Sequence, residues 1–183
     1  SVLDIRDYMG MLERDMANRT IEDRAKMQHE VFGEEAAKQF AIESEVVRLF
    51  IACAKARDYQ ALEQHIKFER TALRQTTTMG TVREKLLGDF HVALAEATGN
   101  RTLAELVREL VARSSLIAML YHSSNDPHCS SDEHAEFLRL CRKGGVEAAV
   151  KSMTEHLERI EASLELGTEK PDRQLDLVKA LLA

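Results

Sequence analysis

The chain has 183 residues, of which 44% are hydrophobic, so it has the length of one domain and can bury a substantial core. Its formal net charge of −6 argues against direct contacts with nucleic-acid phosphates, which need a clustered basic face. The cysteines, Cys53, Cys129 and Cys141, lack CxxC spacing, which indicates neither a disulfide framework nor a thiolate zinc site and favours a reducing cytoplasm. No segment is long and apolar enough for a membrane span, and the N-terminal sequence does not resemble a secretion signal.

Composition and periodicity predict an all-α protein. Proline and glycine are scarce, whereas alanine, leucine, glutamate, arginine and lysine, which favour helices, are abundant. Apolar residues recur with helical spacing almost from end to end, which gives about nine helical segments. The predicted interruptions lie at 18–20, Gly33, 57–58, 76–80, 99–100, 123–131, 144–145 and 167–172.

In chain order, residues 1–32 come first and are rich in charge and methionine, with a helix predicted from Ile21 to Phe32. We expect them to form a helical extension or linker that lies on the rest of the chain or on a second subunit. Residues 33–183 are expected to form the main domain, with a compact antiparallel bundle up to Leu166. Within the bundle, Thr102–Glu105 and Ser130–Glu133 both fit the capping box of a helix start.

Three histidines lie on the apolar faces of three different predicted helices. His91 is spaced with Leu87, Phe90 and Leu94, whereas His134 is followed at helical spacing by Phe137, Leu138 and Cys141, and His156 is flanked by Met153 and Ile160. A buried imidazole must find partners for its ring nitrogens.

These histidines have two interpretations. A single histidine of this kind is most often a core residue satisfied by a carbonyl or water, but three on separate helices also fit a shared metal or ligand site. Neutral imidazoles suit zinc, nickel, iron or copper, and three of them leave coordination positions open. The remaining histidines, His29, His65, His122 and His128, are assigned no role.

Arg113 is the second unusual residue, because it lies on the apolar face of its predicted helix. A buried guanidinium needs an anionic partner, which is either an internal glutamate or a ligand carboxylate. The alternative to ligand binding is a purely structural role, in which Arg113 forms a salt bridge or extends its guanidinium to solvent. Ser114, next in sequence, is a candidate hydrogen-bond donor to the same ligand.

Several catalytic and cofactor motifs are absent from the sequence. No ExxH or HExxH occurs, and neither does a GxSxG, a P-loop or a GxGxxG. No reaction is therefore indicated by a motif.

Three ordered segments carry a family resemblance: Asp89–Asn100, Asp132–Leu138 and Val146–Leu157. Together they resemble the FCD domain, the ligand-sensing C-terminal domain of FadR-type regulators in the GntR family of bacterial transcription regulators. The segment Glu109–Tyr121 is similar to one subgroup of that family.

The resemblance implies an antiparallel helical bundle of the FCD type around a pocket for small organic acids. It implies that His91, His134 and His156 hold a divalent metal, with zinc or nickel the expected ions, and that Arg113 contacts a carboxylate. It also implies a homodimer that acts on DNA through a linked winged helix-turn-helix module.

The chain departs from the family pattern in two features. The family's aspartate, one turn before the first histidine, is Leu87 here, and Asp89 would point to another side of the helix. Residues 1–32 lack the basic recognition helix and strand pair of a winged helix, so we expect the DNA-binding module to lie outside this chain, removed or never present.

The leading hypothesis is a non-enzymatic, cytoplasmic effector-sensing and dimerisation domain that binds a small carboxylate and makes no membrane contact. The alternative is a metal-dependent hydrolase or lyase that uses the same three-histidine pocket, with an activated water. A stand-alone oligomerising scaffold is the third hypothesis.

Overall fold

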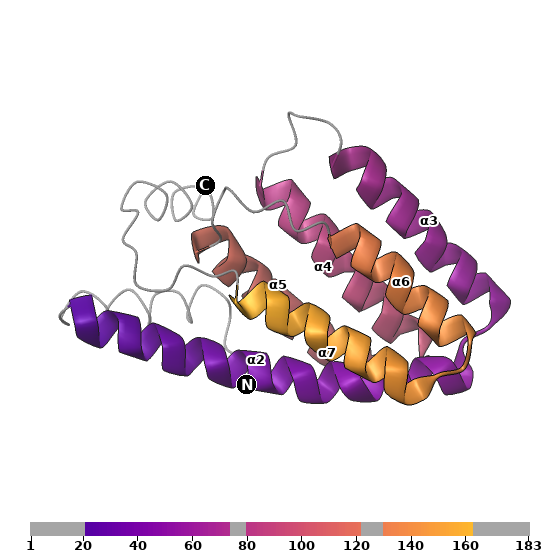
Figure 1. Ribbon diagram of the computed structural model, residues 1–183, viewed down its shortest axis with the longest axis horizontal. Helices are drawn as coiled ribbons and strands as arrows, with labels where there is room; N and C mark the ends of the chain where they lie inside the picture. The colour runs from indigo at the N-terminus through magenta and orange to yellow at the C-terminus, as the bar shows by residue number, and fades with distance from the viewer. Residues whose placement is uncertain (1–20, 74–79, 122–129, 163–183) are drawn as a thin grey trace. The chain divides into compact units, whose positions relative to one another are not determined.

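The computed structural model describes residues 21–73, 80–121 and 130–162, which form six helices and contain no strand (Figure 1). The predicted all-α class is therefore confirmed. The helices are α2 (Ile21–Cys53), α3 (Ala56–Leu73), α4 (Gly80–Ala97), α5 (Arg101–Tyr121), α6 (Ser130–Arg142) and α7 (Val146–Ala162).

One compact unit, Glu35–Leu164, contains the buried apolar core. Within it α4 packs on α3, α5 and α6, and α6 packs on α3 and α7. The short connections between α4 and α5 and between α6 and α7 make each pair antiparallel, as predicted for the bundle. Of the described residues, 21–34 belong to a second unit.

Apolar side chains from the six helices meet in a single core. Phe50, Phe90 and Leu94 are completely buried there, and Leu62 and Met153 nearly so. The helical spacing of these residues gives each helix an apolar stripe that faces its neighbours.

Two helix ends agree with the predicted breaks. Gly99 and Gly144 have φ of 76° and 71°, a left-handed conformation that glycine adopts at little cost. Asn100 then caps α5, because its side-chain oxygen accepts a hydrogen bond from the Leu103 amide at 3.1 Å. The predicted capping box at Thr102 is wrong, since Thr102 already lies inside α5.

The predicted break at Gly33 is also wrong. α2 continues through this residue, and the φ of Gly33 is not positive. Glycine lowers helix stability by only about 1 kcal/mol relative to alanine, and the helix formers that follow it outweigh that cost.

The predicted break at 57–58 lies three residues too late. α2 ends at Cys53 and α3 begins at Ala56. Asp58 does not interrupt the helix, because its carboxylate accepts a hydrogen bond from the Lys55 amide at 2.8 Å and so stabilises the first turn of α3. The predicted breaks at 18–20, 76–80, 123–131 and 167–172 lie wholly or partly outside the described residues.

None of the helices in the described ranges has the length and apolar character needed to cross a membrane.

Candidate metal centre

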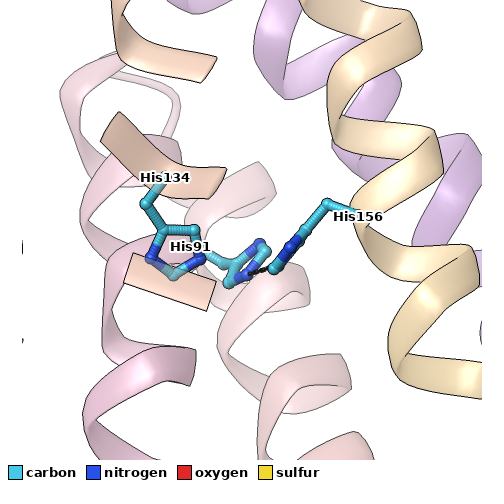
Figure 2. A group of neighbouring side chains, drawn as sticks. All are labelled: His91, His134 and His156. Carbon is cyan, nitrogen blue, oxygen red and sulfur yellow. Dashed lines mark hydrogen bonds between the residues drawn. The ribbon is translucent and has the colours of Figure 1, made fainter. Parts of the chain in front are cut away.

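Three helices bring His91, His134 and His156 together in the core. His91 lies on α4, His134 on α6 and His156 on α7, and Figure 2 shows their rings gathered at one point. One nitrogen from each ring can be chosen so that all three lie within 4.8 Å of one another. All three side chains are buried, so the prediction that they point inward and converge agrees with the geometry.

Aromatic contacts hold the rings in place. His134 stacks on Phe90 with 3.9 Å between ring centroids and 10° between the planes. His91 and His156 are stacked at 5.3 Å, and their Nε2 atoms lie 3.3 Å apart, which is the dashed contact in Figure 2. Packing on all sides leaves each imidazole little freedom to rotate.

Each histidine uses Nδ1 to contact a glutamate. Nδ1 of His91 lies 2.5 Å from Oε2 of Glu43. Nδ1 of His134 lies 3.1 Å from both oxygens of Glu69.

The third pair repeats this arrangement, with Nδ1 of His156 2.5 Å from Oε2 of Glu133. Because a carboxylate accepts hydrogen bonds, each Nδ1 is the protonated donor, and Nε2 carries the lone pair in a neutral ring.

The inward nitrogens fit a bound cation. Nε2 of His134 is fully buried and has no hydrogen-bond partner in the described part of the chain. In neutral rings, the Nε2 atoms of His91 and His156 would also present lone pairs to each other at 3.3 Å. A divalent metal ion among the three atoms would satisfy the orphaned nitrogen and remove this repulsion, and three imidazole donors are an ordinary ligand set for such an ion.

Burial keeps two of the rings neutral. It is the largest effect on His134, where it outweighs the hydrogen bond to Glu69 and lowers the pKa to about 3. Burial likewise lowers the pKa of His156 in spite of its hydrogen bond to Glu133. Both rings are thus in the neutral form that a metal ion needs.

His91 differs from these two histidines. Burial is again the largest effect and disfavours the charged ring, but the charge and hydrogen bond of Glu43 together outweigh it and raise the pKa of His91. A protonated His91 can donate from Nε2 to His156. A metal ion at this centre would therefore compete with one proton on His91.

Leu87 lies in α4 one turn before His91 and is almost fully buried. It offers no oxygen to the centre, as expected from the departure noted in the sequence. Asp89 does not replace it, because its carboxylate forms an ion pair with Lys85 at 2.7 Å near the surface. Among the described residues, the group that could hold a metal ion here consists of the three imidazoles.

Arg113 lies on α5 and forms an ion pair with Glu109, one turn earlier in the same helix. An internal glutamate was one of the two partners expected for it. Its role as a ligand contact stays a prediction.

The hydroxyl of Ser114 donates to Oε1 of Gln39 at 2.6 Å, and Gln39 donates to Glu43 at 2.7 Å. Because Glu43 contacts His91, Ser114 is linked to the histidine cluster through two side chains. Its predicted contact with a ligand also stays a prediction.

Sequence reasoning missed the three glutamates. Glu43 and Glu69 are essentially fully buried, and both lie on apolar stripes. The helical spacing with apolar residues that singled out the histidines would also have identified these two glutamates if it had been applied to carboxylates. Glu133 was interpreted only as a capping residue of α6, yet its oxygens accept from His156 and from Arg159.

His65 was assigned no role, but it contacts Glu69 as well. Its Nε2 lies 3.2 Å from Oε1 of Glu69 and 3.0 Å from the carbonyl oxygen of Leu86 on α4. The hydrogen bond to Glu69 is the largest effect on its pKa, which is raised.

An all-α bundle with a buried cluster of three histidines, a group that could hold a metal ion, defines the class of helical domain to which this chain belongs. Within that class the chain belongs to the FCD domain family, whose model matches residues 36–159. The resemblance carried by the histidine-containing segments is thereby confirmed.

A solved structure supports the same assignment. It is the crystal structure of a transcriptional regulator, a GntR family member, from Pseudomonas syringae pv. tomato str. DC3000. The two chains are 26% identical with a TM-score of 0.56, over 86% of this chain and 67% of that one. Comparison with curated proteins gives no match.

These findings place the chain among the domains of GntR-type regulators, which serve effector sensing in the regulation of transcription. The family is not enzymatic, so the alternative of a hydrolase or lyase is not supported.

Proposed function

We propose that this chain is the effector-sensing and dimerisation domain of a GntR-type regulator and that it binds a small organic acid beside a divalent metal ion. His91, His134 and His156 would hold the metal through Nε2, with zinc or nickel the preferred ions. The observation that carries the metal part is the buried, unpartnered Nε2 of His134 facing the other two rings.

The organic acid is supported by the open coordination that three imidazoles leave. When bound, a divalent metal supplies positive charge and free positions that suit a carboxylate. Arg113 and Ser114 would contribute a guanidinium and a hydroxyl to the same ligand, because both lie on α5 and Ser114 connects through Gln39 to the cluster.

The remaining parts of the proposal concern the assembly. We propose a homodimer with residues 33–183 as the sensing and dimerisation domain and residues 1–32 as an extension or linker. DNA would be bound by a winged helix-turn-helix module outside this sequence, and the regulator would act in the cytoplasm. Effector binding would shift the balance between two geometries of the dimer by its difference in affinity for them.

Elemental analysis tests the metal. The protein purified without chelator should contain about one divalent ion per chain, and His134→Ala should lose it because one of three ligands is removed. Glu158→Ala is the matched control, since this exposed residue lies on α7 two positions from His156. Unmodified protein that holds no metal, even after dialysis against zinc and nickel, would refute this part.

A thermal-shift screen tests the acid. Small mono-, di- and tricarboxylates added to metal-loaded protein should include some that raise Tm, and Arg113→Ala should reduce that rise. Arg108→Ala is the control, because Arg108 lies on the same helix but pairs with Glu96 at the surface. If no carboxylate raises Tm, the organic-acid proposal is wrong.

A further inference from the structure

The three histidines are surrounded by a second set of three residues, one for each ring. Glu43 comes from α2, Glu69 from α3 and Glu133 from α6, so the carboxylates converge from three helices. Every ring therefore has its own glutamate, and no glutamate serves two of the three rings.

Each carboxylate is itself held by an outer partner. Oε1 of Glu43 accepts from Gln39 at 2.7 Å. Oε1 of Glu69 contacts His65 at 3.2 Å. These outer contacts fix the orientation of the carboxylates in a buried environment.

The third glutamate also has an outer partner, because Oε1 of Glu133 accepts a hydrogen bond from Arg159 at 2.5 Å. Three independent repetitions of histidine, glutamate and outer partner form a built arrangement around one point.

The arrangement determines which ring nitrogen faces the centre. A carboxylate that accepts from Nδ1–H holds the ring in the tautomer whose lone pair is on Nε2. The Nε2 atoms are also the ones that meet, as the 3.3 Å separation between His91 and His156 shows. A ring rotated by half a turn would lose its glutamate, so the inward direction of Nε2 is favoured for each histidine.

The arrangement also carries charge. Glu43 and Glu69 are essentially fully buried, and each lies against the ring of one of the three histidines. Buried carboxylates need positive charge close by. Leu87 contributes no carboxylate to the cluster, so a divalent ion among the rings would be balanced by the glutamates that contact them.

We propose that Glu43, Glu69 and Glu133 are positioning residues for the metal, which orient the three histidines and supply, from outside the ligand set, the negative charge that Leu87 does not supply. This inference rests on the proposed metal binding and adds residues that contact the ion only through the histidines.

Glutamine variants separate charge from shape. Glu43→Gln, Glu69→Gln and Glu133→Gln each keep an oxygen that accepts from Nδ1–H but remove the negative charge. Zn²⁺ titration of the metal-free full chain, followed by calorimetry, should show affinity weakened about 10- to 100-fold in each. Glu136→Gln is the matched control on α6, because Glu136 is exposed and pairs with Arg139.

A rescue and a spectrum distinguish positioning from a purely structural role. Leu87→Asp, added to each glutamine variant, should restore most of the lost Zn²⁺ affinity by placing a carboxylate one turn before His91. Co²⁺ added in place of Zn²⁺ should give a visible absorption spectrum that changes in the glutamine variants and stays unchanged in Glu136→Gln. Glu133 is the most exposed of the three glutamates, so Glu133→Gln still tests the proposal if the variant of buried Glu43 or Glu69 does not fold.

The outcomes are distinct. Unmodified protein that binds no Zn²⁺ overturns the proposed metal site and this inference with it. Zn²⁺ binding by the unmodified protein, with folded glutamine variants within twofold of it, overturns the inference alone. Weakened binding with rescue by Leu87→Asp supports both.

Discussion

Each histidine of the cluster uses its two ring nitrogens for different purposes. Nδ1 donates outward to a glutamate, and Nε2 faces the common point. Because packing and hydrogen bonds already hold the rings, a metal ion would bind without first ordering its ligands.

The pKa values of four histidines are shifted in opposite directions, and these shifts predict how the stability of the metal-free protein depends on pH. An unfolded histidine has a pKa of about 6.5. His134 and His156 have lowered values, so below pH 6.5 the unfolded chain binds protons that the folded chain does not, and stability falls as pH falls. His65 and His91 have raised values, so stability falls as pH rises above 6.5 through those values.

Stability of the chelator-treated protein should therefore be greatest near pH 6.5, with a slope of at most about 1.4 kcal/mol per pH unit for each titrating group. Urea unfolding at intervals between pH 4.5 and 9 measures it. His134→Asn should flatten the acid side, since it removes a group whose pKa in the folded state is lowered to about 3. Stability that climbs steadily from pH 6.5 to 8.5 would contradict the assignment of raised values to His65 and His91.

At the scale of helices, the approach of α4 to α5 depends on Gly88. A Cβ at this position would lie 2.6 Å from Cγ1 of Val111 and 3.1 Å from Oγ of Ser115. Because Gly88 precedes His91 by three residues on the same helix, the contact also sets the position of a histidine.

Gly88→Ala should accordingly destabilise the protein by about 1–3 kcal/mol, as overpacking does in a core. Chemical denaturation measures the loss, and reduced Zn²⁺ affinity should accompany it as α4 moves. A stability equal to that of the unmodified protein would mean that α4 and α5 do not lie as close as the structure has them.

Gly33→Ala is the complementary change, in α2. No atom lies within 4 Å of a Cβ built there, and the residue has a helical backbone. Alanine should raise stability by about 0.5–1 kcal/mol because glycine is the poorer helix former. A loss of stability in the same denaturation assay would indicate that α2 is interrupted at this point after all.

At the scale of the whole molecule, metal binding should raise the unfolding temperature. Zn²⁺ at 100 times its Kd stabilises the folded state by about 2.7 kcal/mol, which for a domain of this size corresponds to about 5–10 °C in Tm. Differential scanning calorimetry with and without Zn²⁺ measures the shift, and His156→Ala should abolish it. A shift that persists unchanged in this variant would place the metal elsewhere.

The proposed homodimer predicts a particle of twice the 20.7 kDa chain mass. Sedimentation equilibrium over a hundredfold range of protein concentration tests this, because a dimer in exchange with monomer changes its mean mass by mass action. A mass that stays at one chain throughout would refute the dimer and leave the effector site unaffected.

The sequence by itself was sufficient for the all-α class, the inward direction of the three histidines and the family. Local spacing encodes these features, because a helical period specifies which side chains share a buried face and a glycine in the left-handed region marks a helix end. Gly33 and Asp58 were misjudged because each residue has both a helix-breaking and a helix-compatible role, and the neighbouring residues decide between them.

Only the tertiary structure decided which glutamate accepts a hydrogen bond from each histidine. Glu43 and Glu69 lie 48 and 65 residues from their histidines in sequence, and Glu133 lies 23 residues from His156. A hydrogen bond depends on the rotation of each helix and the rotamer of each side chain to within a fraction of an ångström. Periodicity predicts the face on which a residue lies, whereas the fold selects which buried carboxylate meets which ring nitrogen.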